Sequence, residues 1–459
     1  MAKHHLPVVG GMRSSVHGDG TRETVHPADV GGRFVNARRV VYAVLVLVYL
    51  VVPWLTVAGR PAVLLDIEQR RFLLFGAVLN AQDSWLLFFV LFGIGLTLIA
   101  VTTVLGRVWC GWGCPQTVFL EGVFRPLQRL IEGTRNDRLR RERDGWNFDR
   151  AWRRVLLWSI YLGLASGIAH VFLGYFVPIR SLLRLIAEGP SEHPQAFFWV
   201  TFFTGVWFFD FAWFREQTCL AICPYGRLQS VMTDDDSLVV GYDTQRGEPR
   251  GKLGTEGAGD CVDCGRCVVV CPTGIDIRNG MQLDCIGCTA CIDACDEVMD
   301  KLHRPRGLVR YDSLNGLVGK ARRWLRPRLF FYIAIAVLWA VGVFFATRTR
   351  TSFEANMLRL QGAPYILEGT TVRNAFNVHV VNKLGETHEF VVEPLDPPTG
   401  ATFLIPMRSV RLAPFQGQHL PVFVTLPRGQ SLPGGAVRLR VRCVGTPHVI
   451  TASAPFLQP

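Results

Sequence analysis

The stretch that decides the fold of this chain runs from Cys261 to Cys295 and holds eight cysteines in two runs. The first run reads Cys261-Val-Asp-Cys264-Gly-Arg-Cys267-Val-Val-Val-Cys271-Pro272. The second repeats the spacing as Cys285-Ile-Gly-Cys288-Thr-Ala-Cys291-Ile-Asp-Ala-Cys295-Asp296. Bacterial ferredoxins hold iron–sulfur clusters with this Cys-x2-Cys-x2-Cys-x3-Cys spacing, and they transfer electrons one at a time. We therefore expect an electron-transfer protein.

The spacing predicts two [4Fe–4S] clusters with interleaved ligands. In two-cluster ferredoxins the fourth cysteine of each run ligates the cluster of the other run. The expected ligand sets are Cys261, Cys264, Cys267 and Cys295 for one cluster, and Cys285, Cys288, Cys291 and Cys271 for the other. The alternatives are zinc, whose sites usually use two Cys-x2-Cys pairs, and disulfides, which need an oxidising compartment. Neither alternative fits two complete four-cysteine runs as well.

Hydrophobic residues make up 49% of the chain, and five apolar segments are long enough to cross a bilayer, which takes roughly 20 residues. They are Val40–Val57, Ser84–Leu105, Val155–Val177, Phe197–Phe214 and Leu329–Ala346. Buried core helices are the alternative for any one of them, but five in series favour a membrane protein. The lipid bilayer is therefore an expected partner.

Positive charge predicts the orientation of these segments. Residues 1–39, 106–154 and 215–328 carry 6, 11 and 16 Lys and Arg, whereas 58–83 and 178–196 carry 3 and 2. Because basic loops stay in the cytoplasm, we expect the N-terminus and the cysteine-rich insert in the cytoplasm, and the C-terminus on the outer side of the membrane. The net charge of +12 reflects this topology, and no pattern indicates nucleic-acid binding.

The chain is expected to divide into five parts. They are a cytoplasmic disordered tail (1–39), four transmembrane helices with a basic loop (40–233), a linker with a two-cluster ferredoxin-like α+β domain (234–328), a fifth transmembrane helix (329–347) and an outer domain (348–459). In the basic loop, Arg135–Arg143 is either a surface helix against anionic headgroups or a solvated charge run. Asp234–Asp260 is rich in Gly and Asp and is interpreted as a linker.

The sequence pattern of the outer domain predicts an all-β fold. Short alternating runs such as Phe376–Val381, Leu420–Thr425 and Val437–Val441 are separated by Gly and Pro, which favours a β-sandwich. Cys443 is the one cysteine in this region, so no internal disulfide is expected. We interpret Cys443 as a buried strand residue.

Two further cysteine pairs share a C-x3-C-P pattern. They read Cys110-Gly-Trp-Gly-Cys114-Pro115 and Cys219-Leu-Ala-Ile-Cys223-Pro224, and each follows an apolar segment at the expected cytoplasmic rim. In a helix, residues i and i+4 share a face, while a following proline disfavours helix at the second cysteine. Four thiolates near one point are suited to binding Cu(I) or to cycling between dithiol and disulfide. Ligation of a further cluster is a weaker alternative.

Two ionisable residues lie inside the apolar spans, His170 in the third and Asp210 in the fourth. Intramembrane ionisable groups are costly and often functional. Both are secondary candidates, either for hydrogen bonds between helices or for a proton or metal role. His170 has no second membrane histidine with which to hold a haem.

Taken together, the five spans, the two C-x3-C-P motifs, the eight-cysteine insert and the outer β-domain resemble the FixG/RdxA (CcoG) family of cytochrome c oxidase accessory proteins. The match is strongest at Cys110-Gly-Trp-Gly-Cys-Pro-Gln-Thr117 and Cys219-Leu-Ala-Ile-Cys-Pro-Tyr-Gly226. The chain up to the ferredoxin-like insert is also similar to membrane ferredoxins of the nitrate-reductase quinol dehydrogenase type, which generally lack the outer domain.

The resemblance implies a fold and an activity. The fold would be a five-helix transmembrane bundle with an inserted two-cluster ferredoxin-like domain and a C-terminal Ig-like sandwich. The activity would be reduction of Cu(II) to Cu(I) for assembly of a cbb3-type oxidase, with copper near Cys110, Cys114, Cys219 and Cys223. Implied partners are copper ions and oxidase-assembly or copper-transport proteins. The electron donor is open, and a homo-oligomer is a further expectation.

Two other functions remain open at this point. The chain could carry electrons between the quinone pool and another complex without any copper chemistry. It could instead be a redox-sensing assembly scaffold, whose clusters report oxidation state through the outer domain.

Overall fold

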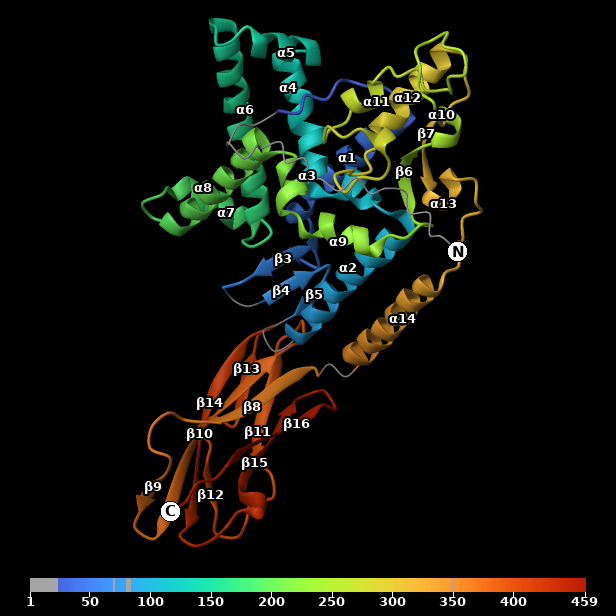
Figure 1. The fold of residues 1–459 in the computed structure, drawn as a ribbon. Coiled ribbons are helices and arrows are strands. Elements are labelled where there is room, and N and C mark those ends of the chain that lie inside the picture. The colour runs from blue at the N-terminus through green and yellow to red at the C-terminus, as the bar shows by residue number, and fades with distance from the viewer. Residues whose placement is uncertain (1–23, 69–70, 80–83, 349–350) are drawn as a thin grey trace. The chain divides into compact units, whose positions relative to one another are not determined.

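The computed structural model of the chain describes residues 24–68, 71–79, 84–348 and 351–459. It separates into two compact units, Met1–Ala340 and Val341–Pro459 (Figure 1). Helices and cysteine-bearing loops make up the first unit, and strands make up the second.

Five helices of the described residues are long and apolar enough to cross a membrane. They are α1 (Arg33–Val51), α2 (Ser84–Leu105), α6 (Phe148–Leu173), α8 (Pro194–Phe209, continued by a π-helical segment to Phe214) and α14 (Pro327–Arg348). Large apolar side chains on these helices, Leu47, Phe88 and Phe198 among them, are well over a third exposed. A surface of this kind suits lipid contact, and it confirms the five expected membrane helices.

The first helix differs from its expected bounds. The predicted span Val40–Val57 runs too far, because α1 ends at Val51 and a 3-10 turn closes at Trp54. Pro53 supplies no backbone N–H for a longer helix.

Short elements lie between the membrane helices. Between α1 and α2 the strands are β1 (Thr56–Val57), β2 (Arg60–Pro61), β3 (Val63–Asp66), β4 (Arg71–Leu74) and β5 (Ala77–Leu79). Between α6 and α8 lies the helix α7 (Ile179–Glu188).

Aromatic packing joins α6 to the segment that follows the second span and to the end of the fourth span. Phe124 stacks on Phe211 with ring centroids 4.3 Å apart, and Tyr161 meets Phe124 edge-on at 4.8 Å. The Tyr161 hydroxyl donates to the Phe124 carbonyl (2.8 Å), which satisfies the polar end of a fully buried ring.

After α2 and α8 the backbone repeats one local structure. A π-helical turn, Trp109–Gly113 in one case and Thr218–Ile222 in the other, ends at an extended cysteine, and a new helix then starts at proline. These new helices are α3 (Pro115–Phe119) and α9 (Pro224–Met232). Proline pushes the preceding residue out of the helical region and suits the first helical position. The break expected at Cys114 and Cys223 is thus present.

The cysteine-rich segment folds around a two-stranded sheet. Strand β6 (Leu238–Tyr242) pairs antiparallel with β7 (Val309–Ser313), and α11 (Arg266–Val269) and α12 (Ala290–Lys301) lie beside it (Figure 1). Interpreting Asp234–Asp260 as a linker was therefore wrong, because this segment supplies β6 and the short helix α10 (Thr244–Gly247). The apolar run within Leu238–Tyr242 is short, and its Gly- and Asp-rich flanks obscured it.

The expected disorder of residues 1–39 is wrong over residues 24–39, while residues 1–23 lie outside the described residues. The Ala28 amide donates to the Val269 carbonyl (2.9 Å), and Val30 packs against buried Val270 and Ala294. Helix α1 begins at Arg33. The polar composition of this segment predicted disorder, but a few apolar residues, among them Ala28 and Val30, attach it to the cluster domain.

The basic run in the loop after α3 is helical. Helix α5 (Arg135–Arg143) follows α4 (Arg125–Glu132), and a capping box between Thr134 and Asp137 starts it. Arg138 is buried and donates to the Pro27 carbonyl (3.2 Å). This part of the run therefore packs on the protein.

The second unit is a two-sheet sandwich. One sheet has the order β12-β14-β10-β8, with β9 paired to β10, and the other has the order β13-β11-β15-β16. The strands are β8 (Phe353–Arg359), β9 (Ile366–Glu368), β10 (Thr371–Asn382), β11 (His388–Pro394), β12 (Thr402–Leu404), β13 (Ser409–Leu412), β14 (Gly417–Pro427), β15 (Ala436–Cys443) and β16 (Val449–Pro455). Alternate residues such as Phe376, Val422 and Leu439 fill its core, and Cys443 is buried there as expected.

Candidate iron–sulfur and thiol site

The structure gathers the eight ferredoxin-type cysteines around two cavities. One cavity is lined by Cys261, Cys264, Cys267 and Cys295. The other is lined by Cys271, Cys285, Cys288 and Cys291, with Cys267 at its edge. Each cavity thus draws its fourth cysteine from the other run, as the interleaved pattern of two-cluster ferredoxins requires.

Burial favours the protonated form of several of these thiols. It raises the pKa of Cys267 to about 11 and those of Cys271 and Cys295 to about 12. A metal must displace such protons to gain its thiolate ligands. Without a bound metal, Cys267, Cys271 and Cys295 are therefore poor nucleophiles.

The donor set suits a cluster better than a single ion. Across the described ranges, no three His, Cys, Asp or Glu side chains converge closely enough to hold one metal ion. A tetrahedral zinc site would need four sulfurs about 2.3 Å from one point, whereas each cysteine of a [4Fe–4S] cluster binds a different iron. Two separate sets of four cysteines, each lining its own cavity, fit two clusters.

The C-x3-C-P cysteines form a second group of sulfurs in the same unit. All four are partly buried, and Cys110, Cys114 and Cys223 each contribute to raising the pKa of Cys219, after burial as the main cause. Burial raises the pKa of Cys110 to about 11, while a hydrogen bond from Gln229 Nε2 to its Sγ (3.1 Å) opposes that rise. The four thiols are neighbours, and within the described part of the chain no three of them converge on one ion position.

Asp210 connects the two C-x3-C-P motifs. Its carboxylate accepts hydrogen bonds from Gln116 Nε2 (3.2 Å) and from the Thr218 hydroxyl. Gln116 follows Cys114-Pro115, and Thr218 precedes Cys219. Of the two roles considered for Asp210, the structure therefore supplies the hydrogen bond between helices.

The hydrogen bonds of His170 are made to Ser166 and not to these cysteines. Its Nδ1 bonds to the Ser166 carbonyl (2.7 Å), one turn earlier in α6. Among the described residues it belongs to no group of three metal-binding side chains. The bond within its own helix satisfies one ring nitrogen without any partner on another helix.

The first C-x3-C-P motif packs directly on the cysteine loop of the second run. A methyl group added at Gly111 would lie 2.6 Å from the Gly287 carbonyl oxygen, so only glycine allows this approach. Arg107 donates to the Cys285 carbonyl (2.7 Å), and Trp112 Nε1 donates to the Tyr311 hydroxyl (3.1 Å). The Tyr311 hydroxyl in turn donates to the Gly287 carbonyl (2.9 Å).

Several of these residues were not identified from the sequence. Gln229, Arg107 and Tyr311 bear on the site through contacts between segments far apart in the chain. Gly111 had a signal in the Gly-Trp-Gly sequence between Cys110 and Cys114, because paired glycines indicate close backbone approach.

Family models match most of the chain in three pieces. A 4Fe–4S binding domain matches residues 86–133, a 4Fe–4S dicluster domain matches 214–314, and the Ig-like fold at the C-terminus of FixG matches 343–459. The first piece contains Cys110 and Cys114, and the second contains Cys219, Cys223 and both ferredoxin-type runs.

Curated relatives match over most of their length. Protein RdxA of Cereibacter sphaeroides is 39% identical over 80% of this chain and 81% of its own length. The chain belongs to the FixG/RdxA family. Nitrogen fixation protein FixG of Rhizobium meliloti is 34% identical over 89% of this chain and 87% of its own length, and RdxB of C. sphaeroides is 36% identical over 81% and 82%. This FixG/RdxA protein is a membrane iron–sulfur electron-transfer protein, as expected, and its fold class is confirmed.

A solved FixG-related protein from Vibrio parahaemolyticus aligns with 24% of this chain and 98% of its own, at 11% identity and a TM-score of 0.20. A score this low establishes neither fold nor function.

Proposed function

We propose that this FixG/RdxA protein reduces Cu(II) to Cu(I) at the C-x3-C-P thiols and so serves assembly of a cbb3-type cytochrome c oxidase. One observation carries the proposal: the motif around Cys110 packs on the cysteine loop Cys285–Cys288, with Gly111 against Gly287. Electrons held at that loop have a short path to sulfurs that suit copper.

The proposed cluster ligands are the two sets around the two cavities. Cys261, Cys264, Cys267 and Cys295 would hold one [4Fe–4S] cluster, and Cys271, Cys285, Cys288 and Cys291 the other. When bound, each cluster supplies one-electron storage and transfer. The chain's own part is to bury the thiols and to hold the Cys285–Cys288 loop against the membrane helices through Arg107.

The proposed copper site consists of Cys110, Cys114, Cys219 and Cys223. Each Cu(II) ion takes one electron and becomes Cu(I), which soft thiolates bind in preference to Cu(II). Thiolate binding therefore favours the reduction. Gln229 orients Cys110, and the Asp210 network keeps the two motifs together.

The protein is proposed to lie in the bacterial inner membrane, with its N-terminus and cluster domain in the cytoplasm and its Ig-like domain in the periplasm. The charge bias of the loops supports this orientation, because the basic loops flank the cysteine-bearing segments. The Ig-like domain would then meet oxidase-assembly or copper-transport proteins.

The test is anaerobic titration of the reduced full-length protein with Cu(II). We expect the absorbance of the oxidised clusters to return as Cu(I) forms, with one Cu(I) for each cluster that is reoxidised. The double variant Cys110→Ser/Cys219→Ser should lose Cu(I) formation and keep its iron, while Cys443→Ser in the β-sandwich core serves as the control. Reduced clusters with no Cu(I) formed would contradict copper reduction and favour an electron conduit to another complex.

A further inference from the structure

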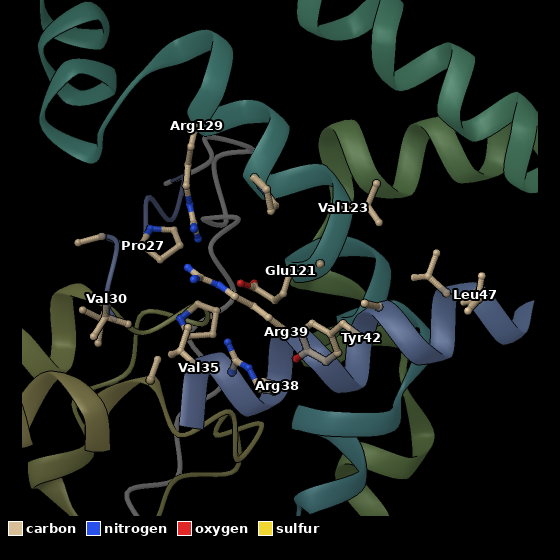
Figure 2. A pocket seen from close by; sticks show the side chains of 18 of the residues that line it. Pro27, Val30, Val35, Arg38, Arg39, Tyr42, Leu47, Glu121, Val123 and Arg129 are labelled. Carbon is tan, nitrogen blue, oxygen red and sulfur yellow. The ribbon is translucent and has the colours of Figure 1, made fainter. Parts of the chain in front are cut away.

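A cavity of about 620 Å³ lies beside α1, outside the cysteine sites (Figure 2). Its walls come from α1, from the segment Pro27–Val30 and from the chain around Glu121–Arg129. Pockets for small organic ligands usually measure roughly 300–1,000 Å³. The volume suits a ring with a short length of attached chain.

The two ends of the cavity differ in chemistry. Arg38, Arg39 and Arg129 lie toward one end in Figure 2, and Leu47 lies at the other. Leu47 and Leu50 are 59% and 43% exposed on a helix that spans the membrane, so this end opens toward lipid. A ligand with a polar head and an apolar tail could enter from the bilayer.

The polar end offers a buried hydrogen-bond donor. Arg38 is only 7% exposed and lines the cavity, and its Nε–H has no hydrogen-bond partner among the described residues. Its Nη1 already donates to the Cys288 carbonyl. A buried donor without a partner is costly, and a carbonyl oxygen of a bound ligand would satisfy it.

The charges disfavour a phospholipid headgroup. Arg129 is paired with Asp29 (2.8 Å), so it is not a free cation for a phosphate, and Glu121 in the same wall is ion-paired with Arg125. A neutral ring with carbonyl groups and one apolar tail needs no free cation in the wall.

We propose that this cavity binds the ring of a membrane quinone, with the carbonyl near Arg38 and the isoprenoid tail along Leu47 and Leu50. The wall also contains Val270, Pro272 and Ala290, which adjoin Cys271 and Cys291 in the chain. The bound ring therefore lies next to the cysteines of the second set.

A quinol bound in this cavity would donate electrons for copper reduction, and that role rests on the proposed function. Binding of the quinone ring does not rest on it. Oxidation of one quinol to the quinone releases two electrons and two protons. The two electrons reduce two Cu(II) ions to two Cu(I) ions. The two protons leave to water at the arginine end, where Arg39 is exposed.

The test is photoaffinity labelling of the full-length protein in liposomes with a short-chain azido-quinone. We expect label on the α1 peptide and on the peptide around Glu121, and excess menaquinone should remove it. In Leu47→Trp the indole fills the apolar end, so labelling should fall by about tenfold or more. Val48→Trp, on a neighbouring lipid-exposed position that does not line the cavity, should label like the unchanged protein.

Equal labelling of Leu47→Trp and Val48→Trp, or label that menaquinone does not remove, would overturn the proposal. A phospholipid retained in native mass spectra and lost only in Leu47→Trp, with no quinone label, would overturn it too. The measurement uses oxidised protein without copper. A failure of copper reduction would therefore leave its outcome unchanged.

Discussion

Gln229 shows how one side chain tunes the C-x3-C-P site. It is fully buried, and its amide nitrogen contacts Cys110 Sγ at 3.1 Å. Burial raises the pKa of the Cys110 thiol, while this hydrogen bond lowers it by stabilising the thiolate. The residue therefore makes the buried sulfur more available to copper.

Replacing Gln229 with leucine should make Cys110 less reactive. Loss of a hydrogen bond to a charged group raises the thiol pKa by about one unit, so alkylation near pH 8 should slow roughly tenfold. Peptide mapping of iodoacetamide-treated apoprotein measures this rate, with Cys114 in the same protein as the internal control. Unchanged alkylation of Cys110 would show that Gln229 only fills space.

Gly111 is the residue on which the contact between membrane helices and cluster domain depends. An added methyl group would meet carbonyl oxygens of Gly287 and Ile286 at 2.6 and 2.8 Å. Contacts below 3 Å force one segment to move. The segment that moves would be the loop carrying Cys285 and Cys288.

Gly111→Ala should weaken the second cluster while leaving the protein in the membrane. Overpacking of this kind costs about 1–3 kcal/mol, so we expect iron to be lost from the Cys285 set at a lower denaturant concentration. Iron content and the electron paramagnetic resonance signals of the reduced protein measure this. The matched control is Gly163→Ala in α6, where nothing lies within 4 Å. Equal iron retention in both variants would contradict the close contact.

Among the elements, α12 and α1 are joined by a cap. Asp293 lies between Cys291 and Cys295, and its carboxylate accepts hydrogen bonds from the amides of Phe34 (3.3 Å) and Val35 (2.7 Å). A carboxylate at a helix N-terminus accepts hydrogen bonds from the free amides, and its negative charge interacts favourably with the positive end of the helix dipole. The cluster domain thus supplies the N-terminal cap of the first membrane helix.

Asp293→Ala should destabilise the cluster domain by about 1 kcal/mol. The temperature at which cluster absorbance disappears under anaerobic conditions should fall. Asp300→Ala is the control, because Asp300 lies on the exposed side of the same helix and pairs with Arg306 at the surface. If both variants lose absorbance at the same temperature, the cap contributes nothing.

At this scale the sequence predicted some elements well and missed others. Cysteine spacing predicted which four cysteines line each cavity, and apolar length predicted the membrane helices, because ligand geometry and bilayer thickness constrain these patterns. The π-helical turns, strand β6 and the ordered segment 24–32 were missed. Strand β6 pairs with β7 and Ala28 bonds to Val269, so both depend on contacts between segments distant in sequence, of which local pattern carries no record.

The same limit applies to the site. The two C-x3-C-P motifs could be found as a repeat, and their expected break at proline is present. The contact of Gly111 with Gly287 could not be predicted, because the two glycines lie far apart in the sequence. Asp210 was identified by its cost in an apolar segment, but its partners Gln116 and Thr218 became evident only in the structure.

For the whole molecule, the proposed orientation places the cluster domain and the Ig-like domain on opposite sides of the membrane. Glu256→Cys and Glu386→Cys introduce thiols at exposed positions of the two units. In intact spheroplasts a membrane-impermeant maleimide should label only Cys at position 386, and disruption of the membrane should allow labelling at 256. Labelling of the Glu256→Cys variant in intact spheroplasts would contradict the proposed orientation.

The central claim is that the segment from Cys261 to Cys295 holds two iron–sulfur clusters beside a thiol-bearing membrane rim. Metal and acid-labile sulfide analysis of the anaerobically purified full-length protein tests it most directly. The account predicts about eight irons and eight sulfides per chain, as two [4Fe–4S] clusters require. Stoichiometric zinc without iron would contradict it.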